Sequence, residues 1–221
     1  SWVKLVSKPG ANEITLGAQD IGTTTANTSK LTVMTWSGSA WGNEPTTTVS
    51  SLLQNSVTPQ VQIEGFDIAY ESLSGDRFIV YTQPGTTAGI YYRTYNTGGN
   101  VLGTATSSAA YTSPATPRLS SDPYSDKILF MYNRNASANI YGKIWDGATL
   151  GASTTLGATG LNPTVIEKRL VNSAWLRSGT TSYAVAFWRT TTTTTIAYRV
   201  YDGTAGTWLT AGTNPTVAAP Q

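Results

Sequence analysis

The stretch Lys143-Ile144-Trp145-Asp146-Gly147 ends an apolar strand in a large aromatic ring and then turns. An Asp-Gly pair at the end of such a run is the strongest short-range signal for a β-hairpin. The same element returns about every 55 residues, a period typical of repeat folds. Its other copies are Val33-Met34-Thr35-Trp36-Ser37-Gly38, Tyr92-Arg93-Thr94-Tyr95-Asn96 and Arg199-Val200-Tyr201-Asp202-Gly203.

Two further elements repeat with the same period. A nearly continuous apolar run precedes each turn, as expected for strands that are buried on both faces, at residues 12–16, 76–81, 126–131 and 182–188. A proline-containing segment recurs around Pro59, Pro114, Pro163 and Pro215. Polar stretches after the turns supply a fourth strand that suits the outer edge of a sheet.

Four strands in a unit of about fifty residues match one propeller blade. We therefore predict an all-β fold, a β-propeller of four four-stranded blades that forms one domain over residues 1–221. The expected blades cover residues 1–57, 58–112, 113–161 and 162–212. The first unit lacks a proline segment and residues 213–221 carry a surplus one, so this segment is expected to pair into the first blade and close the ring. The alternative is that the four units are part of a larger propeller.

The composition excludes several kinds of chemistry. The 221 residues include no Cys and no His, which removes disulfides, thiolate metal sites and the commonest general base. The 14 Lys and Arg residues are scattered singly, and the net charge is only +2. We expect no cofactor, no metal, no nucleic-acid partner and no membrane insertion. Many Thr, Ser, Gly, Tyr and Trp residues favour an extracellular or cell-surface location.

The repeat units resemble the blades of bacterial extracellular propellers in the broad sialidase-like group. The residues that carry the resemblance are Phe66-Asp67-Ile68-Ala69-Tyr70-Glu71, Ser74-Gly75-Asp76-Arg77 and Tyr91-Tyr92-Arg93-Thr94-Tyr95-Asn96. The enzymes of this group carry a Ser-x-Asp-x-Gly motif, and here Phe78 stands where its Gly belongs. Their arginine-isoleucine-proline motif is not matched either, since Leu119 follows Arg118. The resemblance therefore implies a non-catalytic module, and we expect that the chain is not an enzyme.

Aromatic residues at or just beyond the repeated turns are the candidate ligand-binding residues. They are Trp36, Trp41, Tyr95, Trp145, Tyr201 and Trp208. An aromatic face stacks on the apolar face of a pyranose while nearby polar groups bond its hydroxyls. The alternative is that the rings pack between adjacent blades. Trp41 and Trp208 stand beside turns and are expected to be the exposed pair.

Charged residues support two further hypotheses. Arg93, Lys143 and Arg199 each lie two residues before a repeated aromatic, where they either bind anionic ligands or are solvated and paired. A glycoside hydrolase needs two opposed carboxylates, and Asp67 with Asp122 is one such candidate pair. Asp at such places also caps turns by bonding to neighbouring backbone.

These observations favour a non-catalytic structural or adhesive propeller of a cell surface or appendage, in contact with other proteins or with copies of itself. A lectin with repeated aromatic sites, whose partners are glycans, is the first alternative. A carboxylate-dependent glycoside hydrolase is the second.

Overall fold

The chain is built from β-strands joined by turns. The computed structural model describes residues 2–19, 29–42, 50–53, 56–58, 61–62, 64–83, 89–96, 101–110, 116–134, 137–158, 171–190, 195–210 and 212–216. Every regular element within these ranges is a strand, and they contain no helix. Consequently, no helix in this part of the chain has the length and apolar character needed to cross a membrane.

Four antiparallel sheets follow one another along the sequence. The first contains β1 (Trp2–Ser7), β2 (Ile14–Gln19), β3 (Ser29–Trp36), β4 (Trp41–Gly42) and β5 (Ser50–Leu53). The second contains β8 (Phe66–Tyr70), β9 (Arg77–Gln83), β10 (Gly89–Asn96), β11 (Val101–Leu102) and β12 (Thr106–Ala110). The third contains β13 (Arg118–Ser121), β14 (Ile128–Arg134), β15 (Ser137–Trp145) and β16 (Thr154–Ala158). The fourth contains β17 (Val171–Ser178), β18 (Thr181–Arg189), β19 (Thr195–Asp202), β20 (Thr207–Trp208) and β21 (Gly212–Thr216).

The fourth strand of each sheet is interrupted. In the first sheet both β4 and β5 pair with β3, in the second both β11 and β12 pair with β10, and in the fourth both β20 and β21 pair with β19. In the third sheet an isolated bridge between Trp145 and Leu150 precedes β16. Each sheet therefore has the four predicted strands, with the outermost one in two pieces. A separate two-stranded pair joins β6 (Ser56–Thr58) to β7 (Val61–Gln62).

The repeated turn forms because its Asp holds the backbone. The Oδ1 atom of Asp146 accepts hydrogen bonds from the N–H groups of Ala148 (2.9 Å) and Thr149 (2.7 Å). Gly147 follows with a φ of 95°, in the left-handed region that favours glycine. Asp202 holds the corresponding turn of the fourth sheet through the N–H groups of Thr204 and Ala205. These contacts confirm the turns predicted from the Asp-Gly pairs.

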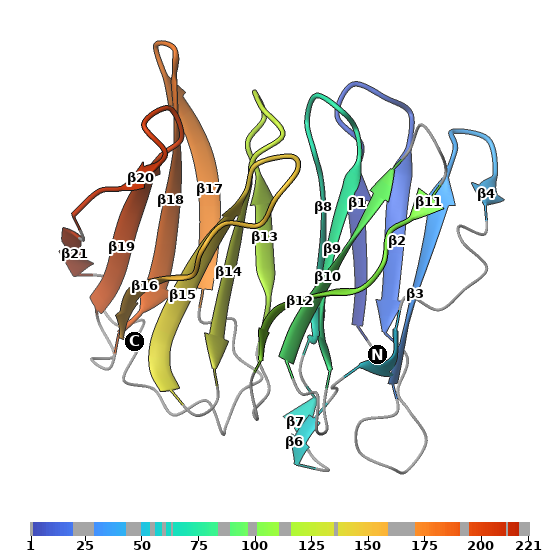
Figure 1. Cartoon of the computed structure of the whole chain (residues 1–221), viewed down its shortest axis with the longest axis horizontal. Helices are drawn as coiled ribbons and strands as arrows, with labels where there is room; N and C mark the ends of the chain where they lie inside the picture. Colours follow the sequence, from blue (N-terminus) through green and yellow to red (C-terminus); the bar gives the residue numbers. More distant parts are fainter. Residues whose placement is uncertain are drawn as a thin grey trace.

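The sheets pack face to face in sequence order. Their innermost strands β1, β8, β13 and β17 contact one another in that order, and each junction between sheets has its own hydrophobic cluster. Figure 1 shows the sheets side by side, with the first sheet in blue at one end of the row and the fourth in orange and red at the other. This packing of four small sheets is a β-propeller arrangement and confirms the predicted fold class.

The middle strands are buried on both faces, as their continuous apolar runs predict. In β9, Phe78 and Val80 belong to the cluster shared with the third sheet, whereas Ile79 and Tyr81 belong to the cluster shared with the first. In β14, Phe130 faces the second sheet. The alternation of these residues places one sheet between two neighbours.

The end of the chain differs from the expected closing segment. Within residues 213–221, Thr213 and Thr216, which lie in β21, pair with β19 of the fourth sheet and not with the first sheet. Strands β5 and β12 occupy the same position in the first and second sheets. An outer edge tolerates Pro215, which has no N–H group to donate. The remaining repeated prolines at 59, 114 and 163 lie outside the described residues.

Candidate functional site

The aromatic residue at the end of the third strand of each sheet pairs with an equivalent position in all four sheets. Each ring on the third strand pairs across the sheet with an apolar residue just beyond the turn. The pairs are Trp36 with Trp41, Tyr95 with Leu102, Trp145 with Leu150, and Tyr201 with Trp208. The predicted site residues are thus structurally equivalent.

Three of these rings lie in the core. Tyr95, Trp145 and Tyr201 are only 2%, 4% and 7% exposed. Trp145 stacks on Phe78 of the second sheet, and Tyr201 packs in a cluster with Leu129 of the third. The rings of Trp145 and Tyr201 are thus covered by the preceding sheet, as the alternative interpretation describes, whereas the guanidinium of Arg77, in the same sheet as Tyr95, lies over the Tyr95 ring, 4.0 Å from its centroid.

Among the described residues, no sheet precedes the first one and covers its pair. Trp41 is 46% exposed, and Trp36 is half-buried with its ring centroid 5.6 Å from that of Trp41. The two indoles are tilted by 57° and form one aromatic surface. Their exposure therefore follows from the place of the first sheet in the row.

In the fourth sheet, Trp208 combines a half-buried ring with a neighbouring cation. The Trp208 ring centroid lies 5.3 Å from the Tyr201 ring centroid, and the guanidinium of Arg199 lies 5.9 Å from the Trp208 centroid. Arg199 donates from Nη1 to the carbonyl of Thr155 (2.9 Å) in the third sheet, and from Nε to that of Leu209 (3.0 Å). Trp208 and Arg199 thus lie where the third and fourth sheets meet.

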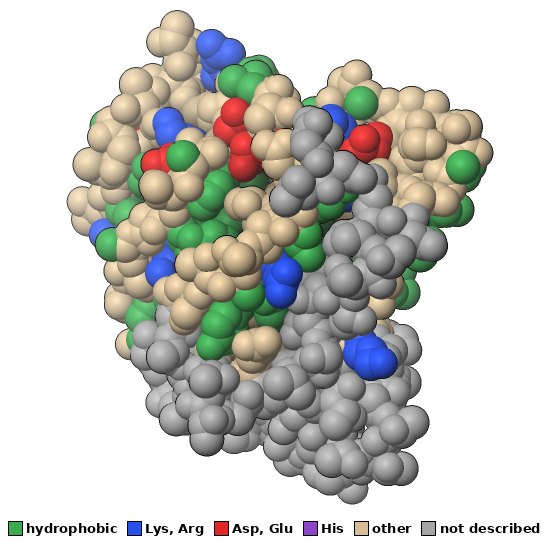
Figure 2. Space-filling model, turned by 45° about the vertical axis from the view of Figure 1, so that its right-hand side comes forward, with side chains coloured by type: hydrophobic (Ala, Val, Ile, Leu, Met, Phe, Trp, Pro, Cys, Tyr) green, Lys and Arg blue, Asp and Glu red, His purple; other side chains and the backbone are tan. Residues whose placement is uncertain are grey.

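Lys143 occupies the position of Arg199 in the third sheet. Its Nζ donates to the carbonyl of Ser108 (2.6 Å) in the second sheet, and burial lowers its pKa. In the second sheet, Arg93 makes longer contacts within its own sheet, to Tyr81 Oη (3.5 Å) and Gly103 O (3.4 Å). Lys143 and Arg199 therefore cross-link neighbouring sheets. Basic side chains appear in small separate groups among the described residues on the face shown in Figure 2.

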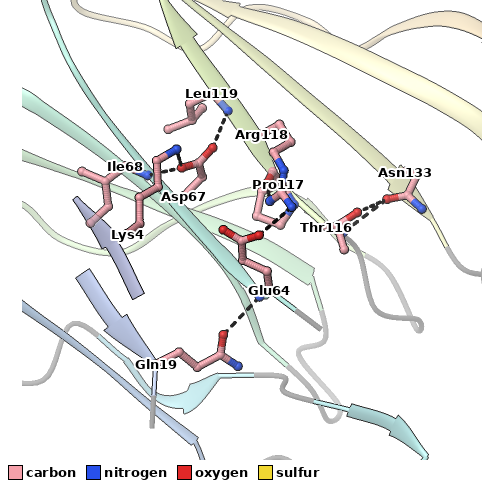
Figure 3. A network of polar contacts seen from close by, with 11 residues as sticks. Lys4, Gln19, Glu64, Asp67, Ile68, Thr116, Pro117, Arg118, Leu119 and Asn133 are labelled. Carbon is pink, nitrogen blue, oxygen red and sulfur yellow. Dashed lines mark hydrogen bonds and ion pairs between the residues drawn. The ribbon is translucent and has the colours of Figure 1, made fainter. Parts of the chain in front are cut away.

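A polar network ties three innermost strands together (Figure 3). The carboxylate of Asp67 in β8 accepts from Nζ of Lys4 in β1 and from the backbone N–H of Ile68 (2.8 Å) and of Leu119 in β13 (2.8 Å). Glu64 pairs with Arg118 at 2.7 Å. With two cations against two carboxylates the network is balanced in charge, and it fastens the first three sheets.

The two acids considered for hydrolysis are both buried and hydrogen-bonded. Asp122 accepts from the N–H of Tyr124 (3.0 Å), from Oγ of Ser125 (2.7 Å) and from Oγ of Ser182 in the fourth sheet (3.0 Å). It thus caps its turn, whereas Asp67 belongs to the network above.

Glu71 is an acidic residue that the sequence analysis did not select as a site residue. Its Oε1 accepts from Nε1 of Trp145 (2.6 Å), and its Oε2 accepts from Oγ of Ser74 (2.6 Å). Burial raises its pKa, and the nearby charges of Asp126 and Asp76 add to that rise. No sequence signal pointed to Lys4 with Asp67 either, since 63 residues separate them.

Comparison with known proteins gives matches in structure only. No family model and no curated protein matches the chain. An arginine-to-alanine triple mutant of AofleA from Arthrobotrys oligospora is similar with a TM-score of 0.56 and 15% identity, over 98% of this chain and 57% of that one. A mutant of the Aleuria aurantia lectin in complex with α-methyl-L-fucoside has a TM-score of 0.49 and 14% identity, over 96% and 61%.

A third similar structure is a mutant exo-β-1,3-galactanase from Phanerochaete chrysosporium with β-1,3-galactotriose. Its TM-score is 0.49 and its identity 10%, over 96% of this chain and 49% of that one. The chain thus spans less than two thirds of the length of each of these three structures. Lectins and glycoside hydrolases are therefore among the proteins to which it is similar.

The galactanase corrects one expectation. The prediction that the chain is not an enzyme is withdrawn, because glycoside hydrolases are among the structures to which it is similar and the fold gives no ground for excluding a reaction. At these identities the likeness itself shows the fold and not a reaction.

Proposed function

We propose that this propeller binds carbohydrate at the junction of its third and fourth sheets, with Trp208 as the stacking ring and Arg199 as the hydrogen-bond donor. The observation that carries the proposal is the position of the Arg199 guanidinium, 5.9 Å from the centroid of the half-buried Trp208 ring. A ring offers its face to the apolar side of a pyranose, and a guanidinium donates to its hydroxyls.

The surroundings of the pair support this role. Gly142 in β15 lies so close to the Trp208 ring that a Cβ there would be 2.9 Å from Cζ2, so the indole is held against the third sheet. Nε and Nη1 of Arg199 donate to backbone carbonyls, which fixes the guanidinium over the ring. Both groups are thereby positioned before a ligand arrives, which lowers the entropy lost on binding.

The biological setting is part of the same proposal. We place the protein outside the cell or on its surface, among propellers of the sialidase-like group, in an adhesive role. Support comes from the strand and turn motifs and from a composition rich in Thr, Ser and aromatic residues. The lectin and the galactanase that the chain resembles are both complexed with sugars.

A glycan array probed with the wild-type chain and with Trp208→Ala and Arg199→Ala tests the proposal. Each substitution is expected to weaken binding about tenfold, the loss of one stacking or charge-assisted contact. Trp41→Ala is the matched control, since it removes an exposed tryptophan from the first sheet. Silence of the wild-type chain across the array would refute carbohydrate binding, and loss only in Trp41→Ala would refute the site.

Product analysis after incubation with the bound oligosaccharide separates binding from hydrolysis. An intact oligosaccharide would show binding alone, and shorter products would show that the site also cleaves its ligand.

A further inference from the structure

The first sheet presents an uncovered apolar surface at one end of the row. Its leading face turns away from the second sheet and carries Val3, Leu5, Ile14, Leu16, Met34, Trp36 and Trp41, with Ser7, Ala18 and Thr32 among them. Val3 and Leu5 are 63% and 61% exposed. Trp2 and Val6, which alternate with them along β1, pack against the second sheet. An apolar sheet face of this extent on the surface marks an interaction site.

The fourth sheet presents a second such surface at the opposite end. Its trailing face turns away from the third sheet and carries the apolar residues Leu176, Tyr183, Val185, Phe187, Tyr198 and Val200, with the polar residues Asn172, Arg189 and Asp202 among them. Leu176 is 47% and Phe187 is 39% exposed. The alternate residues Ala184, Ala186 and Trp188 are buried against the third sheet. Both end sheets thus have one buried and one uncovered apolar face.

These two surfaces correspond to the two halves of a junction between sheets. Trp36 pairs with Ile14 as Trp145 pairs with Ile128, and Trp145 is buried by the preceding sheet. At the other end, Leu176 follows Trp175, which pairs with Ala184, and Glu71 follows Tyr70, which pairs with Arg77. Leu176 and Glu71 therefore occupy equivalent positions in the fourth and second sheets. Glu71 contacts the following sheet through Trp145, whereas Leu176 is exposed.

We propose that a second copy of this chain packs head to tail on the first, with the trailing face of one fourth sheet covering the leading face of the next first sheet. Such a contact continues the series of junctions already present within the chain. The two faces lie at opposite ends of the row (Figure 1), so one copy offers both halves without covering either. Apolar side chains then meet apolar side chains across an interface of the heterologous type, which forms rings or chains of copies.

This inference does not rest on carbohydrate binding, because Arg199 and Trp208 lie on the buried side of the fourth sheet. Sedimentation velocity of the 221-residue chain over a range of concentrations is expected to show association into oligomers. Leu5→Glu and Leu176→Glu, each placing a charge on one face, should each weaken self-association about a hundredfold or more. Leu73→Glu, at a 72% exposed turn residue outside both faces, is the matched control.

Mixing the two variants gives the decisive result. Leu5→Glu retains an intact trailing face and Leu176→Glu an intact leading face, so a one-to-one mixture should form a heterodimer while each variant alone is monomeric. Circular dichroism establishes that both variants are folded. A wild-type chain that is monomeric at all concentrations would overturn the proposal, because neither end face would then bind a second copy. Variants that still associate alone, or a mixture that forms no heterodimer, would overturn it as well.

Discussion

The indole Nε1–H of Trp145 in the third sheet donates a 2.6 Å hydrogen bond to Oε1 of Glu71 in the second. Trp145 is 4% exposed and Glu71 3%, so this contact between sheets is shielded from water. Removal of a buried acceptor leaves its donor without a partner, and the cost is then the full desolvation of that donor.

Glu71→Ala is expected to lower the free energy of unfolding by about 1–3 kcal/mol, because Trp145 Nε1 loses its acceptor. Glu71→Gln keeps an acceptor oxygen and should lose much less. Urea denaturation at pH 7 measures both. Equal stabilities of the alanine variant and the wild type would show that the hydrogen bond contributes nothing.

Glu71 should also make stability depend on pH. Its pKa in the folded chain is raised above 4.5 by burial, with the charges of Asp126 and Asp76 adding to the rise. The folded state therefore holds the proton more tightly than the unfolded chain, and the free energy of unfolding falls as the pH rises from about 4.5 through the folded pKa. Glu71→Gln has no titrating carboxyl group and should therefore show a smaller fall of the free energy of unfolding over this pH range. A series of denaturation curves from pH 4 to 8 checks it, and unchanged slopes in the variant would contradict it.

Asp67→Ala should be among the most destabilising substitutions. The change removes the acceptor of Lys4 and of the Leu119 backbone and releases β1, β8 and β13 from one another. Loss of one member of a buried ion pair costs about 3–5 kcal/mol, and the partial exposure of Lys4 places the expected value near the lower limit. Asp202→Ala, in an exposed turn, is the control and should cost only about 1 kcal/mol. Similar losses in both variants would argue against a special role of the network.

Gly17→Ala should destabilise the junction between the first two sheets. A Cβ at this position would lie 2.6 Å from Cδ1 of Ile68 and 2.7 Å from Cε2 of Phe66. Overpacking of this kind costs about 1–3 kcal/mol. Thr32→Ala, at an exposed position of the neighbouring strand, should change stability by less than ~0.5 kcal/mol. Thermal unfolding compares the stabilities of the two variants. A Gly17→Ala variant as stable as the wild type would mean that the first two sheets move apart to accommodate the methyl group at little cost.

Local patterns predicted the strands and turns because their causes lie within a few residues. Asp146 and Gly147 form their turn through contacts with Ala148 and Thr149. The apolar run around Phe78 required burial on both faces, and only a sheet between two neighbours provides it. The contact of Lys4 with Asp67 was not predictable, since nothing local brings together residues that are 63 positions apart.

The sequence by itself determined that four equivalent units exist and that an aromatic residue ends the third strand of each. Only the tertiary structure decided which rings are buried, because burial depends on whether another sheet precedes the one that carries the ring. Tyr95, Trp145 and Tyr201 have such a neighbour, whereas Trp36 has none within the part of the chain that the structure describes. Equivalent residues in a repeat therefore differ in exposure according to their place in the row, a property that no single unit contains.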